Sequence, residues 1–193
     1  MIRSALVLLA LSFAVPLAAQ PAAAPSRPNP AEARRAELDR LFEALKTAPD
    51  TQGGQLVESR IRAVWGQAAS PATGLLLRRG MRNLQRNEAA EALEDFDAAL
   101  VLDPAAPDGW LLRARAYGAL GDRTAAARDL REVLRLEPRH FGALLQLSEL
   151  QQEAKDLPGA LRSLDAALAL HPKMPGGDVR RRDLARLAEG DAL

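Results

Sequence analysis

The chain has 193 residues, of which 48% are hydrophobic and 26% are charged, and these values are ordinary for a folded protein. Its 26 basic residues nearly balance its 25 acidic ones, so no strong long-range field draws it to nucleic acid or to an anionic membrane surface. The lack of cysteine excludes disulfide bonds and thiolate catalysis. Alanine and leucine dominate while aromatic residues make up only 4%, which favours packed helices over sheets.

Residues 1–19 have the layout of a secretory signal peptide. Arg3 precedes an apolar stretch from Ala5 to Val15, and the small residues Ala18 and Ala19 follow it. The stretch is too short to cross a bilayer as a helix, which needs about 20 residues. We therefore expect cleavage near Ala19, a periplasmic or secreted protein, and no integral membrane segment after cleavage. An uncleaved N-terminal anchor is the alternative.

The next two segments are a spacer and a helical hairpin. Residues 20–31 form a Pro/Ala-rich linker without helical periodicity, which favours an extended chain. Residues 32–69 predict two helices, one that runs to Pro49 and one over residues 55–67. Their apolar sides comprise Leu38, Leu41, Phe42 and Leu45 in the first helix, and Leu56, Val57, Ile61, Val64 and Trp65 in the second. Because these sides are too large to leave in water, we expect the hairpin to cover the first end of the array that follows.

After Pro71 the sequence repeats at a constant interval of 34 residues, which we call the repeat period. Each unit predicts two helices, and a proline ends the second one because it lacks an amide hydrogen and clashes with a continued helix. Small residues in both helices allow a close approach. Gly121 and Asp122 predict the reversal between the helices of the middle unit, with Asn87-Glu88 and Lys155-Asp156 in the equivalent places. When the three units are aligned, each set of equivalent positions forms a column. The columns include Pro104, Pro138 and Pro172; Ala92, Ala126 and Ala160; Phe96, Leu130 and Leu164; and Gly80, Ala114 and Ser148.

This pattern resembles the tetratricopeptide repeat, a 34-residue helix-turn-helix unit with the motif W-x2-L-G-x2-Y, A-x3-F, P. The middle unit matches the motif best, with Trp110, Ala114, Tyr117, Ala126 and Pro138. The resemblance implies an all-α fold, a right-handed α-solenoid of three units over residues 73–106, 107–140 and 141–174. The sequence departs from the family at Arg79 and Arg113, where leucine is usual, and Tyr117 has no aromatic counterpart at Asn83 or Gln151.

Residues 175–193 predict a C-terminal capping helix and tail. We expect Asp178 to cap the helix, Val179, Leu184 and Leu187 to face inward, and Gly190 to end it. The basic run from Arg180 to Arg182 is interpreted as a solvated outer face, with a patch for an acidic partner as the alternative.

The sequence offers little for catalysis. It contains no metalloprotease, nucleophile-elbow or phosphate-loop motif, and its two histidines, His140 and His171, are interpreted as surface residues of loops between helices. We expect no enzyme, no cofactor and no metal.

A protein-binding groove is the function that the resemblance implies. In this family the first helix of each unit lines a concave groove. The corresponding positions are Leu77, Met81, Leu84, Asp108, Leu111, Arg115, Leu145, Glu149 and Gln152. Among them Leu77, Leu111 and Leu145 lie one repeat period apart and predict an exposed apolar row, which is typical of an interaction site.

The clamp with which some relatives capture chain-terminal carboxylates is absent. Its places hold Leu77, Met81, Leu112, Gly142 and Gln146, so carboxylate capture by that clamp is not expected. The sequence therefore predicts an adaptor or scaffold whose groove takes an apolar or amphipathic segment of another protein. The alternatives are a structural or assembly subunit that uses its convex face or ends, self-association through the groove, coverage of the row by the N-terminal hairpin, and an accessory domain for a cell-wall enzyme.

Overall fold

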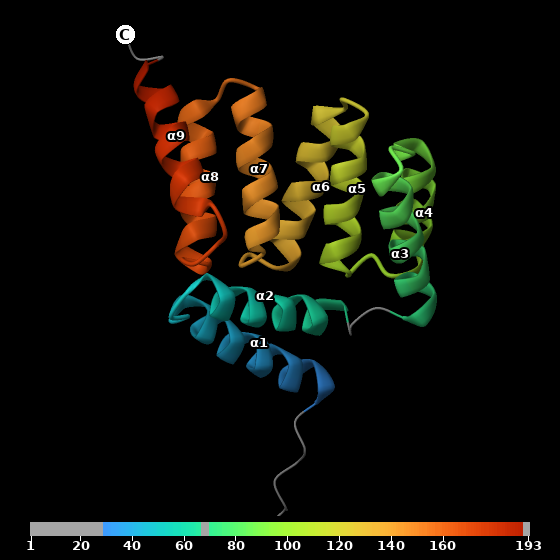
Figure 1. Ribbon diagram of the computed structural model, residues 1–193. Coiled ribbons are helices and arrows are strands. Elements are labelled where there is room, and N and C mark those ends of the chain that lie inside the picture. The colour runs from blue at the N-terminus through green and yellow to red at the C-terminus, as the bar shows by residue number, and fades with distance from the viewer. Residues whose placement is uncertain (1–28, 67–69, 191–193) are drawn as a thin grey trace, which may run out of the picture.

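The computed structural model describes residues 29–66 and 70–190. The predicted signal peptide and residues 20–28 of the predicted linker lie outside the described residues. Within them every regular element is an α-helix (Figure 1). The helices are α1 (Pro30–Lys46), α2 (Thr51–Gly66), α3 (Pro71–Gln85), α4 (Ala89–Leu102), α5 (Pro107–Ala119), α6 (Arg123–Leu136), α7 (Phe141–Glu153), α8 (Leu157–Leu170) and α9 (Gly177–Gly190).

Helices α3 to α8 form three antiparallel pairs that stand side by side (Figure 1). This arrangement confirms the predicted all-α repeat fold. Each pair reverses at a residue with positive φ, and these residues, Asn87, Gly121 and Lys155, have φ of 62°, 80° and 65°. Asp122 and Asp156 then cap the second helices of their pairs, whereas the side chain of Glu88 makes no capping hydrogen bond with the described residues.

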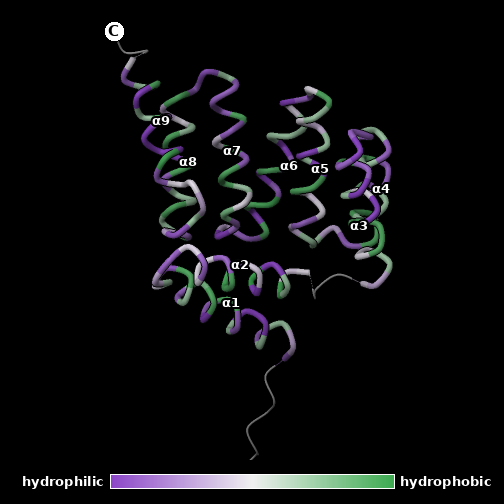
Figure 2. The backbone as a smooth tube through the Cα atoms, viewed as in Figure 1, coloured by the Kyte–Doolittle hydropathy of each residue, from purple (hydrophilic) through white to green (hydrophobic). Residues whose placement is uncertain are grey.

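The small residues predicted to bring paired helices together are buried. Ala92, Ala126 and Ala160 pack against the first helices of their pairs, and Ser148 donates a hydrogen bond from Oγ to the Ala160 carbonyl at 2.8 Å. Hydrophobic and hydrophilic residues alternate along the helices (Figure 2), so each helix buries one side and exposes another.

Both helices of the N-terminal hairpin begin earlier than predicted. α1 begins at Pro30, inside the predicted linker, because Asn29 and Glu32 form a capping box there. α2 begins at Thr51 rather than at residue 55, since the Asp50 carboxylate accepts a hydrogen bond from the Gly53 amide at 2.7 Å. Leu56 is 67% exposed, contrary to its predicted inward position.

The hairpin does not cover the first end of the array, and that expectation is wrong. It crosses beneath the ends of α5, α7 and α8 (Figure 1), and its apolar core packs on Phe141 at the start of α7. Leu170 and Met174 lie at the margin of the same cluster. The buried hairpin residues in this cluster are Leu38, Phe42, Leu45, Ile61, Val64 and Trp65.

The first end of the array is polar by itself, which explains why the hairpin is free to pack elsewhere. In the second unit, Leu112 and Ala116 of α5 are buried against the preceding α4. The residues one repeat period earlier are Arg78 and Arg82 of α3, which have no preceding unit to pack on and are exposed. Guanidinium groups at these positions solvate the end of the array, as terminal repeats require.

The other end is covered by α9, which packs Leu184 against α8. The predictions for Val179 and Leu187 are wrong, since these side chains are 53% and 50% exposed. Asp178 lies in the first turn of α9 instead of capping it, because the helix begins at Gly177. Helices in the described ranges are too short or too polar to be candidates for a membrane span.

Candidate binding groove

Two neighbouring cavities lie where α2 crosses the first helices of the repeats. The α5–α7 cavity has a volume of about 510 Å³ and is lined by residues of α2, α5 and α7. The α3–α5 cavity has a volume of about 280 Å³ and is lined by residues of α2, α3 and α5. Arg62 of α2 and Arg115 of α5 line both. We call the two cavities together the groove.

Seven of the nine predicted site residues line this groove. The α3–α5 cavity contains Leu77, Met81, Asp108, Leu111 and Arg115, and the α5–α7 cavity contains Arg115, Leu145 and Glu149. The other two lie elsewhere. Leu84 packs against the hydrophobic cluster of Ala92 and Phe96, and Gln152 lines a separate hollow beside α9.

The predicted row of exposed leucines is only partly open. Leu111 is 4% exposed and belongs to a core cluster with Ala126 and Leu130, so its prediction as an exposed residue is wrong. Leu77 and Leu145 are half-buried, and Met81 is 39% exposed. Among the predicted site residues, the apolar surface that a partner could touch is therefore concentrated at Met81 and at the exposed parts of Leu77 and Leu145.

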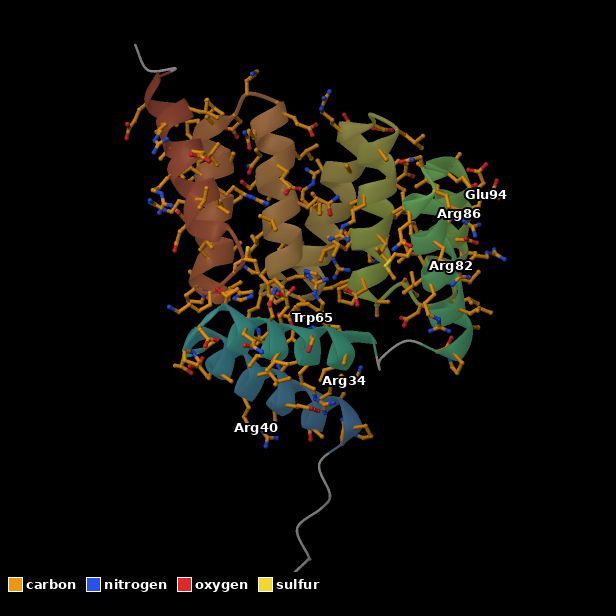
Figure 3. All side chains as sticks on the ribbon, in the orientation of Figure 1. Arg34, Arg40, Trp65, Arg82, Arg86 and Glu94 are labelled. Atoms are coloured by element: carbon orange, nitrogen blue, oxygen red, sulfur yellow. The ribbon has the colours of Figure 1, made fainter. Side chains whose placement is uncertain are left out.

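The hairpin contributes groove residues that the sequence analysis missed. Glu58, Arg62 and Trp65 of α2 line the groove, as does Met174 after α8. In Figure 3, Trp65 lies where α2 meets the lower ends of the repeat helices. The sequence gives no local signal for these residues, because they reach the groove only through the long-range docking of the hairpin.

His140 is buried and joins the hairpin to the second and third units. Its Nδ1 accepts a hydrogen bond from the Ala143 amide at 3.2 Å and caps α7, so the ring proton resides on Nε2, which lies 3.4 Å from Oδ1 of Asp108. The ring stacks on Trp65 with centroids 4.2 Å apart and planes 12° apart. The prediction that His140 is a surface loop residue is therefore wrong.

His171 is also buried, contrary to its prediction as a surface residue, and it contacts the other end of α2. Its Nε2 lies 3.2 Å from Oε2 of Glu58, and its ring meets Phe141 edge to face at 5.7 Å. This hydrogen bond lowers the pKa of Glu58 below its ordinary value, and the charge of Arg62 acts in the same direction against the opposing effect of burial. Glu58 is thus held ionised at the wall of the groove.

A third contact fixes α1. Arg139 donates a hydrogen bond to Asp39 at 2.6 Å, and its guanidinium lies 4.5 Å from the centre of the Phe42 ring. These anchors are Arg139, His140 and His171, and each lies within two residues of a repeat proline, in the loops where one unit passes to the next.

Gly54→Ala is expected to weaken the docking of the hairpin. An added Cβ would lie 2.9 Å from Cε1 of His171 and 3.2 Å from Cβ of Lys173, so α2 would have to move away from the repeats. Hydrogen exchange in α1 and α2 should become roughly tenfold faster while α5 and α6 keep their protection. The control is Gly66→Ala at the end of the same helix, where an added Cβ meets none of the described atoms within 4 Å. Unchanged exchange in Gly54→Ala would contradict the described packing.

The acidic groups of the groove already have partners. Glu58 binds His171 and Arg62, Asp108 binds His140, and Glu149 accepts a hydrogen bond from Arg180 of α9 at 3.0 Å. Arg115, by contrast, forms no ion pair or side-chain hydrogen bond with the described residues. Burial lowers the pKa of Arg115 and the nearby charge of Arg62 adds to this effect, while the charges of Glu149 and Asp108 oppose it; the residue as a whole is exposed.

The described residues contain no cluster of three His, Asp or Glu side chains arranged as metal ligands. The two histidines are occupied by the structural contacts above. The walls of the groove present half-buried leucines, an exposed methionine and guanidinium groups.

Comparison with known proteins relates the chain to tetratricopeptide repeat proteins. No family model matches the chain. It is 27% identical over 144 residues to a TPR repeat-containing protein of Rhizobium etli, covering 75% of this chain and 71% of that relative. It is 40% identical over 85 residues to a tetratricopeptide repeat and J domain-containing co-chaperone of Fusarium oxysporum, covering 44% of this chain but 16% of that protein.

A solved tetratricopeptide repeat domain has a similar fold. The first TPR domain of Spaghetti (RPAP3), bound to an HSP90 peptide, superposes with a TM-score of 0.60 at 19% identity and covers 63% of this chain and 98% of that domain. At this identity the likeness concerns the fold. The period of the sequence, the three helical pairs and these comparisons agree: the chain has an all-α helical repeat fold and is similar to tetratricopeptide repeat proteins.

Proposed function

We propose that the chain is a non-enzymatic adaptor whose groove holds an apolar or amphipathic segment of another protein. The observation that carries this proposal is the pair of adjoining cavities lined by the first helices of all three units, with half-buried Leu77 and Leu145 and exposed Met81 on their walls. The similar RPAP3 domain was solved with a peptide bound, which supports a peptide as the class of ligand. Residues 1–19 support a periplasmic or secreted setting, which belongs to the same proposal.

Filling the groove is the direct test. Gly118 of α5 lines the α5–α7 cavity, and a Cβ added there would meet none of the described atoms within 4 Å. Gly118→Trp should therefore occupy the groove without disturbing the core. We expect proteins that cross-link to the wild-type chain in envelope extracts of its native host to be lost, at least tenfold, with this variant.

The matched control is Gly190→Trp, at the end of α9 and outside the groove, where an added Cβ likewise meets none of the described atoms. It should cross-link the same proteins as the wild type. Undiminished cross-linking by Gly118→Trp would exclude the groove. If the protein lost with Gly118→Trp were a second copy of this chain, light scattering would report a dimer, and self-association would replace the adaptor role.

A further inference from the structure

We propose that Arg62 and Arg115 bind the carboxylate of an acidic side chain in the middle of an otherwise apolar protein segment. This inference rests on the proposed function, because it names the chemistry of the segment that the groove holds. It concerns residues outside the places of the terminal-carboxylate clamp, and one of them, Arg62, comes from the hairpin and not from a repeat.

The two arginines lie at the junction of the cavities. They are the residues that line both, one projecting from α2 and the other from α5. Apolar surface lies on either side of them. Leu77 and Met81 line the α3–α5 cavity, and Leu145 and Met174 line the α5–α7 cavity.

Arg115 has no ion pair or side-chain hydrogen bond at this junction with the described residues, although the charges of Glu149 and Asp108 act on it from nearby. Arg62 shares Glu58 with His171, and the donor atoms of Arg62 lie 2.6 and 3.0 Å from that carboxylate. The other acids of the groove are bound to His140, Arg180 and Arg123. Arg115 therefore keeps its hydrogen-bond donors for an incoming anion, and a guanidinium binds a carboxylate with two parallel hydrogen bonds.

Arg115 and Arg62 also repel one another. Their proximity is one cause of the lowered pKa of Arg115. A carboxylate between them would relieve this repulsion.

The position of the arginines selects a side-chain carboxylate over a chain end. Because a cavity extends on both sides of the pair, a segment that fills both must continue in both directions from the charged point. A terminal carboxylate would leave one cavity empty. The occupant is therefore a segment with apolar side chains before and after one Asp or Glu.

Three synthetic heptapeptides of leucine, alanine and serine test this inference. The first has a central glutamate and both ends blocked, the second has glutamine in its place, and the third has the central glutamine and a free C-terminal carboxylate. Binding to the full chain is followed by NMR chemical shifts of groove residues up to millimolar peptide. We expect the glutamate peptide to bind about tenfold more tightly than the glutamine peptide, and the third peptide to bind no better than the second.

Arg115→Gln should remove this preference, because the glutamate and glutamine peptides would then bind alike. Arg86→Gln, which changes an exposed arginine at the end of α3 far from α2 (Figure 3), should preserve it. Equal binding of the first two peptides to the wild type would overturn the carboxylate site and leave the groove function standing. Equal binding of the first and third would overturn the mid-segment position. If none of the peptides shifted groove resonances, both this inference and the proposed function would fall.

Discussion

Replacing Arg113 by leucine is expected to destabilise the protein by about 3–5 kcal/mol, because it leaves a buried carboxylate without its partner. Asp129 of α6 is buried, and Arg113 of α5 donates two hydrogen bonds to it at 2.7 and 2.9 Å. These bonds raise the pKa of Arg113 above its ordinary value. The loss should appear as a lower midpoint in urea unfolding, followed by circular dichroism.

The third unit supplies the control for this variant. Leu147 and Ser163 stand one repeat period after Arg113 and Asp129, so the double change Arg113→Leu with Asp129→Ser copies a combination that this fold already contains. The double variant should regain most of the stability, because no buried charge is left unpaired. A double variant as unstable as Arg113→Leu alone would show that the arginine acts through something other than Asp129.

Gly80→Ala and Gly118→Ala are expected to change stability in opposite directions. A Cβ at Gly80 would lie 2.5 Å from Cε1 of Phe96, a ring that is completely buried between α3 and α4. This overpacking should outweigh the better helix propensity of alanine and destabilise the protein by about 1–2 kcal/mol. At Gly118 the same substitution meets none of the described atoms within 4 Å, so it should stabilise the protein by about 0.5 kcal/mol.

Thermal unfolding of the two variants beside the wild type measures both effects. Since the chemical change is identical, the difference between them reports the packing at Gly80 and Phe96 alone. Two variants with the same melting temperature would mean that α3 and α4 are further apart than described.

The repeat array could be predicted from the sequence because its determinants are local and recur. The helices α4, α6 and α8 each end two residues before Pro104, Pro138 and Pro172. The reversals at Asn87, Gly121 and Lys155 all have positive φ, and the glycine of the middle unit is the residue that predicts this conformation. Seven of the nine predicted groove residues lie together for the same reason: the helical period places them on one side of α3, α5 and α7.

The hairpin's position could not be predicted because it depends on contacts between residues far apart in the chain. His171 meets Glu58, and Arg139 meets Asp39 across 100 residues. Taken alone, a histidine beside a proline indicates a loop, and the sequence does not reveal that α2 covers that loop. The polarity of the first end could nevertheless have been predicted, because Arg78 and Arg82 stand at positions that are apolar in the second unit.

The role of the arginines that depart from the family pattern could also have been predicted from the sequence. Arg79 and Asp95 recur one repeat period later as Arg113 and Asp129, and both members change together in the third unit. The structure pairs Arg79 with Asp95 and Arg113 with Asp129. Considered singly, Arg79 and Arg113 are only departures from the family pattern, whereas a search for columns that change together would have found the ion pairs.

The guanidinium groups at the first end of the array set a limit on its length. Docking an additional upstream module would bury Arg78 and Arg82 without acidic partners, at a cost of several kcal/mol for each charge. Two copies brought together through these ends would meet the same obstacle as mutual repulsion. These two arginines thus oppose polymerisation of the chain through this end. Lengthening the solenoid by design would first require apolar residues at both positions.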